Sequence, residues 1–122
     1  MDLEQLQDLA EKKLKINDTE LDLESLKTPQ LHNEFMKHLT KFKLLLTRAE
    51  DEFKLIKREK WEYYTGKSDP AVYQLKPFNL KIMRSDVDKY IEADEEYTKA
   101  YQKVKYLEVT VDFLDRTIRQ IS

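Results

Sequence analysis

The sequence predicts an all-α protein: a long antiparallel helical hairpin with coiled-coil-like packing plus a short N-terminal helix, assembling into a homo-oligomer. Three observations lead to this fold class. Only one of the 122 residues is glycine, charged residues make up 38%, and apolar side chains recur every seven residues over two long stretches. A chain so poor in glycine and so rich in Lys, Glu and Leu favours long helices over sheets and turns. Its length is that of one domain.

Residues 1–27 are predicted to hold a short amphipathic helix and a connector. The helix extends from Asp2 to about Lys13, because apolar residues recur on one side of it. That side consists of Leu3, Leu6, Leu9, Ala10 and Leu14. The following segment is compatible both with a short helix capped by Asp18 and with an extended "LDL" at 21–23.

A long helix is predicted over residues 28–65. Thr28 can cap its start, and Pro29 suits the first helical position. One heptad row comprises Phe35, Phe42, Ala49, Ile56 and Tyr63, and a second comprises Leu39, Leu46 and Phe53. Gly66 can adopt the left-handed conformation that ends a helix. Residues 66–84, which include Pro70 and Pro77, are predicted to form a loop.

The final helix is predicted over residues 85–122. Ser85 with Asp88 resembles a capping box, and two apolar rows then continue for more than four heptads. The residues expected in the core or in oligomer contacts are Tyr90, Tyr97, Val104, Leu107, Val111, Leu114 and Ile118. Since neither long helix covers both sides of its partner, the remaining apolar surface predicts self-association.

Charge is unevenly distributed along the chain, whose formal net charge is −2. Residues 1–53 carry 8 basic and 12 acidic side chains, residues 54–84 carry 8 and 3, and residues 85–122 carry 6 and 9. The three net charges are therefore −4, +5 and −3. Residues 54–84, here called the basic island, thus lie between two acidic flanks.

Composition and motifs exclude several classes of protein. Without cysteine, disulfides and thiolate metal sites are impossible, and no apolar run reaches the roughly 18 residues of a membrane span. The triplet Gly66–Ser68 is no phosphate-binding loop, because Trp61 stands where such a loop needs its first glycine. His32 and His38 are six residues apart, a poor spacing for one metal on a helix. We expect a non-enzymatic, intracellular protein without a cofactor.

The basic island concentrates cations and aromatic rings at the end of the long helix. Five basic residues fall within the fourteen positions from Lys54 to Lys67. The helix dipole accounts for one or two of them. Cations that follow a phosphate chain, beside rings on which bases stack, are what sequence-tolerant binding of single strands requires. The predicted DNA-binding site consists of Lys54, Lys57, Arg58, Lys60, Trp61, Tyr64 and Lys67.

Two other interpretations of these residues stay open. The cations and rings are also compatible with ordinary packing of a helix end. They are equally compatible with a coiled-coil structural adaptor, whose basic island meets an acidic protein partner without any nucleic acid. Stacking of bases on Trp61 separates DNA binding from the adaptor, because it quenches tryptophan fluorescence.

At these residues the chain resembles the UvsY family of recombination mediators from T-even-type bacteriophages and their relatives. The resemblance rests on Arg58 and Lys60, followed by "YYTG" at 63–66 and by Lys67. It extends to the N-terminal "LEQLQDLAEKKLKINDTEL" and to "VDFL" at 111–114, and it covers essentially the whole chain.

The resemblance implies a fold, a function and partners. Members of the family are all-helical, bind single-stranded DNA, form ring-like homo-oligomers, and help load the phage recombinase onto DNA coated by single-strand-binding protein. It further implies one recombination-mediator domain over residues 1–122, located in the host cytoplasm. The DNA-contacting basic pair falls on Arg58 and Lys60, with the two cation types exchanged, so contact details should differ. Members usually continue through a further basic and aromatic stretch, so a chain ending at Ser122 is expected to be truncated or a short member.

Overall fold

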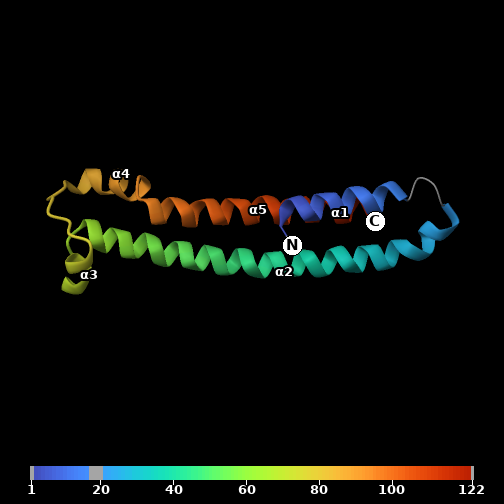
Figure 1. Cartoon of the computed structure of the whole chain (residues 1–122), viewed down its shortest axis with the longest axis horizontal. Helices are drawn as coiled ribbons and strands as arrows, with labels where there is room; N and C mark the ends of the chain where they lie inside the picture. The colour runs from blue at the N-terminus through green and yellow to red at the C-terminus, as the bar shows by residue number, and fades with distance from the viewer. Residues whose placement is uncertain (1, 17–20, 122) are drawn as a thin grey trace. The chain divides into compact units, whose positions relative to one another are not determined.

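The computed structural model describes residues 2–16 and 21–121, and every regular element in those ranges is helical (Figure 1). The elements are α1 (Leu3–Ile16), α2 (Leu21–Tyr64), α3 (Pro70–Leu75), the 3-10 turn η1 (Arg84–Asp86), α4 (Val87–Glu92) and α5 (Glu95–Ile121). The all-α prediction is therefore confirmed for this part of the chain. The predicted cap at Asp18 and the chain end at Ser122 lie outside the described residues.

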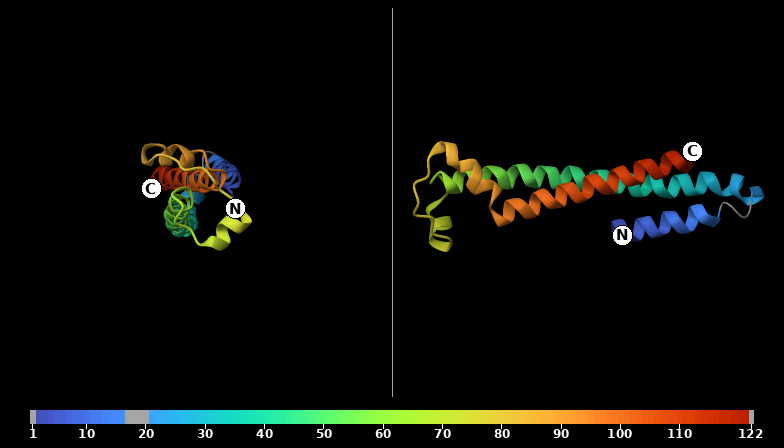
Figure 2. Two further views of the ribbon diagram at one scale, coloured as in Figure 1. Left: turned by 90° about the vertical axis from the view of Figure 1, so that its left-hand side faces the viewer. Right: turned by 90° about the horizontal axis from the view of Figure 1, so that it is seen from above.

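The chain divides into two compact units. Unit 1 comprises Met1–Leu45 and Leu107–Ser122, and unit 2 comprises Leu46–Tyr106. Within unit 1, α1 and the last part of α5 lie alongside the first part of α2 in each view (Figures 1 and 2). Lys13 of α1 forms an ion pair there with Glu34 of α2. Three helical segments thus share one core in this unit.

The core of unit 1 is mostly aliphatic. Leu6 of α1, Phe35 of α2 and Leu114 of α5 are each fully buried. Among the side chains of this unit that the structure describes, the other buried apolar ones are Ala10, Leu31, Leu39, Phe42, Leu107 and Ile118. Thr110 and Thr117 are buried as well, although both lie outside the predicted heptad rows. A straight helix has 3.6 residues per turn and drifts relative to a strict seven-residue repeat, which brings these threonines to the core.

The start of the long helix differs from the prediction at Thr28. α2 begins at Leu21, and Pro29 lies inside this 44-residue helix. A proline removes one N–H donor from a helix, and the many remaining backbone hydrogen bonds tolerate that loss here. The ambiguous "LDL" segment is therefore helical. α1 begins with a capping box, because the Asp2 carboxylate accepts from the Gln5 N–H at 2.8 Å and the Gln5 amide oxygen accepts from the Asp2 N–H at 3.1 Å.

The end of α2 agrees with the prediction at Gly66. This glycine has a φ of 77°, in the left-handed region, and its N–H donates to the Tyr63 carbonyl at 3.3 Å. The Lys67 N–H donates to the Glu62 carbonyl at 2.8 Å. The two hydrogen bonds form a Schellman motif, which satisfies carbonyls at the helix end. The predicted glycine cap is confirmed.

The segment that follows departs from the predicted loop and from the predicted single final helix. A short helix, α3, begins at Pro70, and the Asp69 carboxylate caps it by accepting from the Ala71 N–H at 3.1 Å. The predicted capping box at Ser85 does not form, because η1 occupies that position and α4 begins without a side-chain cap. The final helix is then interrupted between α4 and α5.

That interruption lies at Asp94. Its N–H bonds back to the Ile91 carbonyl at 3.0 Å, and its carboxylate accepts from the Tyr97 N–H at 3.1 Å. Asp94 is thus the N-cap of α5. Aspartate competes with the helix backbone for hydrogen bonds and favours caps over helix interiors, which explains why the helix restarts here.

In unit 2 the last part of α2 packs against the first part of α5. Phe53 lies 5.1 Å from Tyr97 between ring centroids, and Lys103 pairs with Glu52 at 3.6 Å. Lys60, further along α2, reaches Asp94 before the start of α5. The paired positions rise along one helix as they fall along the other, so these segments are antiparallel. Coiled-coil packing and the homo-oligomer stay predictions.

Seven side chains of the final helical region were predicted for the core or for oligomer contacts. Val104, Leu107, Leu114 and Ile118 are buried. Tyr97 and Val111 are half-buried, and Tyr90 of α4 is 36% exposed. A role for these residues in oligomer contacts stays a prediction.

Candidate nucleic-acid interface

Four residues of the predicted site share one face of the last turns of α2. Lys57 and Arg58 each lie three or four positions from both Lys54 and Trp61 along the helix, which places the four residues on one face. All four are exposed, with the Trp61 residue 39% exposed and the Arg58 side chain 70% exposed. These four residues, together with Lys67, are here called the outer stripe.

The cations of the outer stripe have few competing partners. Arg58 Nε lies 3.7 Å from the Glu62 carboxylate, and such an exposed pair contributes little stability. Among the residues that the structure describes, no acidic side chain pairs with Lys54 or Lys57. These ammonium groups are therefore accessible to phosphate.

Lys67 completes the outer stripe from beyond the end of the helix. Because Gly66 turns the chain, the Lys67 ammonium reaches the indole of Trp61 at 4.5 Å from the ring centroid. A cation at this distance is attracted by the electron-rich face of the ring. The turn thus places a positive charge and an exposed aromatic surface next to each other.

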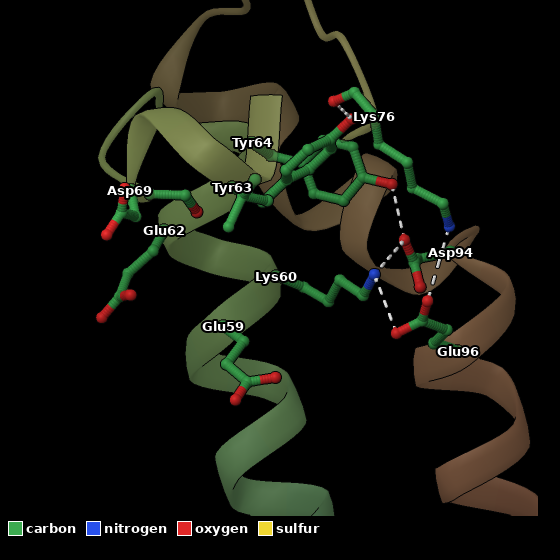
Figure 3. Close-up of a pocket in the computed structure, with 11 residues that line it drawn as sticks. Glu59, Lys60, Glu62, Tyr63, Tyr64, Asp69, Lys76, Asp94 and Glu96 are labelled. Carbon is green, nitrogen blue, oxygen red and sulfur yellow. Dashed lines mark hydrogen bonds and ion pairs between the residues drawn. The ribbon is translucent and has the colours of Figure 1, made fainter. Parts of the chain in front are cut away.

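Lys60 belongs to a different environment. Its side chain is only 13% exposed, and its ammonium lies 3.4 Å from Asp94 Oδ2 and 3.2 Å from Glu96 Oε2 (Figure 3). Figure 3 shows the side chain extending from α2 toward these two carboxylates. The structure therefore does not bring Lys60 together with the outer stripe.

Tyr64 is likewise engaged inside unit 2. Its hydroxyl donates to Asp94 Oδ2 at 2.7 Å, and its ring contacts those of Phe78 and Tyr90 at 5.1 and 5.8 Å. Burial, followed by this hydrogen bond to the Asp94 carboxylate, raises the pKa of Tyr64 far above its ordinary value. The predicted role of Tyr64 as a surface ring for stacking is not favoured by this geometry.

Lys60, Tyr64, Asp94 and Glu96 together are here called the clamp. Burial alone would raise the pKa of Asp94, but hydrogen bonds from the Tyr64 hydroxyl and the Tyr97 N–H, together with the Lys60 ammonium, lower it below its ordinary value. The pKa of Glu96 is also lowered, chiefly because Lys60 donates a hydrogen bond to its carboxylate. Both acids are therefore ionised at neutral pH.

Aromatic side chains fix the chain that follows α2. The rings of Tyr63 and Tyr73 are stacked, with centroids 5.4 Å apart. The Tyr73 hydroxyl donates to the Tyr63 carbonyl at 2.8 Å, and the Tyr63 hydroxyl donates to the Lys76 carbonyl at 3.0 Å. These contacts hold α3 and the residues after it against the end of α2.

Two further cations of the basic island line a hollow of about 560 Å³ in unit 2. Lys81 and Arg84 are exposed there, and Tyr64, Gly66 and Phe78 are among the other lining residues. Both cations belong to the basic island but are not among the predicted site residues, and they lie in a segment predicted to be a loop.

The inward placement of Lys60 had a signal in the sequence. Lys60 lies seven residues after Phe53 and so continues the second heptad row of the long helix. A lysine in a core row has its stem against the partner helix, and its ammonium then needs a carboxylate. No such regularity marks Asp94 as the partner, because that pairing depends on where the final helix is interrupted.

Comparison with known proteins bears on nearly the whole chain. The model of the family described as "Recombination, repair and ssDNA binding protein UvsY" matches residues 9–122. The chain belongs to this family. No curated protein and no solved structure gives a significant match. The match confirms the resemblance inferred from Arg58, Lys60 and the residues after them. The description of the UvsY family names recombination, repair and single-stranded DNA binding, and it names no reaction.

Two negative findings concern the residues that the structure describes. None of their helices combines the length and hydropathy needed to cross a membrane. Nor do three of their histidine or acidic side chains come close enough together to hold a metal ion.

Proposed function

We propose that this chain binds single-stranded DNA through the outer stripe and acts as a recombination mediator without enzymatic activity. The observation that carries the proposal is the exposed Trp61 ring with the Lys67 ammonium beside it, continuous with Lys54 and Arg58 on one helix face. The family to which the chain belongs supports the same function.

Each part of the outer stripe has a distinct task. Lys54, Lys57 and Arg58 neutralise successive phosphates, which releases counterions and makes binding depend on salt. The Trp61 ring offers a face for a base, and one stacked base contributes about 1–3 kcal/mol. Because every base has such a face, binding tolerates any sequence. Arginine adds a planar, bidentate contact that lysine lacks.

Loading of a recombinase requires more than one such site. A single stripe is short, so we propose that self-association presents several stripes to one strand. Linked sites raise the overall affinity without new contacts. A strand held at several points is then available to the phage recombinase while the single-strand-binding protein is displaced.

Removal of two stripe cations tests the site. Lys54→Ala combined with Arg58→Ala should weaken binding to oligo-dT roughly tenfold or more. It should also reduce the magnitude of the slope of log affinity against log salt by about 1.4, because each phosphate contact contributes about 0.7. Fluorescence anisotropy over a salt series measures both quantities.

The matched control removes two cations elsewhere. Lys99→Ala with Arg116→Ala changes net charge equally, and both side chains are exposed and pair only within α5. An equal loss in the test and control variants would show that only overall charge matters and would remove the stripe from the proposal.

Trp61 fluorescence separates DNA binding from the adaptor function. Stacking of a base should quench the indole emission when oligo-dT is added at low salt, and added salt should restore it. Unchanged emission together with no binding by anisotropy would favour an adaptor that meets an acidic protein instead.

A further inference from the structure

Lys60 carries the positive charge that the family resemblance pairs with Arg58, yet the structure gives the two residues different surroundings. The Arg58 side chain is 70% exposed, whereas that of Lys60 is 13% exposed. We propose that Lys60 is a positioning residue, which ties the end of α2 to the start of α5 and does not itself contact phosphate. This role rests on the proposed function, because what it positions is the outer stripe.

The clamp leaves Lys60 little capacity for another anion. Its ammonium already lies within 3.4 Å of two carboxylates, those of Asp94 and Glu96, and the Asp94 side chain is only 10% exposed. A phosphate would have to displace Asp94 and leave that carboxylate buried without its cation. Breaking a buried ion pair in this way is strongly unfavourable.

The position of Asp94 explains how the clamp acts on the stripe. Its carboxylate caps α5 through the Tyr97 N–H and accepts from the Tyr64 hydroxyl, while it pairs with Lys60. Lys60 and Tyr64 flank Trp61 in the last turn of α2. With both flanking residues attached to one carboxylate, the last turn has a fixed orientation.

A fixed last turn places the remaining stripe residues. The Schellman motif begins at Glu62, and it determines where the chain leaves the helix before Lys67. Loss of the clamp would therefore loosen the geometry that holds the Lys67 ammonium 4.5 Å from the Trp61 ring centroid. The cations of Lys54, Lys57 and Arg58, further back on the helix, would stay in place.

Two identical substitutions three residues apart distinguish positioning from phosphate contact. Lys60→Met should lower the melting temperature by roughly 4 °C or more and leave the salt slope of oligo-dT binding at the wild-type value. Lys57→Met should leave the melting temperature unchanged and reduce the slope by about 0.7. A reduced slope for Lys60→Met, whatever its melting temperature, would overturn the proposal.

A double-mutant cycle tests whether Lys60 and Asp94 act together. Asp94→Asn retains a good N-cap residue while removing the charge. In the double variant with Lys60→Met, the fall in melting temperature should be smaller than the sum of the two single falls, because the partners act together. Additive falls would show that the two side chains are not coupled, and would also overturn the proposal.

The variant Glu96→Gln tests whether Lys60 contacts phosphate once one of its two carboxylate partners is neutralised. Glu96 is 59% exposed in its side chain, so this variant should fold normally. If Lys60 were a phosphate contact restrained by its carboxylates, release of one carboxylate would raise the slope by up to about 0.7. We expect no increase, and an increase would contradict positioning.

Failure of this inference is distinguishable from failure of the proposed function. If the wild-type chain does not bind oligo-dT, the proposed function is lost, and the melting temperatures of the Lys60→Met and Asp94→Asn cycle still decide whether the clamp exists. If the wild type binds and Lys60→Met reduces the salt slope, only the positioning role is lost.

Discussion

The core of unit 1 and the end of α2 in unit 2 hold their helices together with different chemistry. In unit 1, Leu6, Phe35 and Leu114 are fully buried and apolar. At the end of α2 in unit 2, Lys60 and Asp94 meet instead, surrounded by tyrosines. Apolar burial contributes most of the free energy of folding but tolerates small displacements, whereas hydrogen bonds and ion pairs demand particular distances and angles. The difference suggests that unit 1 supplies stability and that the clamp region of unit 2 supplies geometry.

Loss of apolar burial in unit 1 should change the free energy of unfolding more than any other substitution considered. Leu114→Ala removes a fully buried side chain and should lower the free energy of unfolding by about 2–5 kcal/mol, through lost burial and the cavity left behind. Urea unfolding followed by circular dichroism measures the change. The salt slope of DNA binding should stay unchanged under conditions where the variant is folded.

The control for this substitution lies on the same helix. Val109 is 56% exposed, so Val109→Ala should change the free energy of unfolding by less than about 0.5 kcal/mol. Similar losses for the two variants would mean that the burial of Leu114 does not determine the stability of unit 1.

A smaller effect is expected from the pH dependence of the stability that the Asp94 carboxylate contributes to the clamp. The pKa of Asp94 is lowered in the folded chain, so its stabilising contribution is present above the ordinary value of 3.8 and is lost as the pH falls through the lowered pKa. Lys60 and Tyr64 from α2, and the Tyr97 N–H and Glu96 from α5, are the groups facing it.

The corresponding measurement compares melting temperatures over a pH series. The wild type should exceed Asp94→Asn at neutral pH, and the difference should shrink once the pH falls below 3.8, where the aspartate takes up its proton. Asp112 pairs with Arg116 at an exposed site, so Asp112→Asn should give a small difference at every pH. A wild-type advantage over Asp94→Asn that persists undiminished in acid would contradict an ionic role for Asp94.

Much of the fold could be predicted from the sequence because apolar periodicity and capping chemistry are local. The rows containing Phe35 and Leu114 mark buried faces, and Gly66 marks a helix end, without knowledge of any partner. The start of α2 and the interruption of the final helix were not predicted correctly. In both places a local signal, Pro29 or Ser85, was outweighed by the rest of the structure.

The candidate site was predicted only in part for a related reason. The exposure of Lys54, Arg58 and Trp61 could be predicted because none of the three belongs to an apolar heptad row. The pairing of Lys60 and Tyr64 with Asp94 joins residues thirty or more positions apart, and it depends on a break that periodicity does not show. Composition therefore indicates where the charge lies but not which charges are already neutralised.

Apart from the control variants, substitution of Gly66, which lies between Tyr64 of the clamp and Lys67 of the outer stripe, should change the free energy of unfolding least. Its φ of 77° is strained for residues with a side chain, although nothing lies within 4 Å of an added Cβ. Gly66→Ala should therefore cost about 1 kcal/mol from backbone strain alone. Gly66→Asn is the matched control and should cost less, because asparagine adopts the left-handed region more readily. Urea unfolding measures both variants, and Trp61 emission reports whether Lys67 still lies beside the indole. Equal stability of the alanine, asparagine and wild-type chains would mean that this turn does not require a left-handed residue. The placement of Lys67 in the outer stripe would then not depend on the Schellman motif.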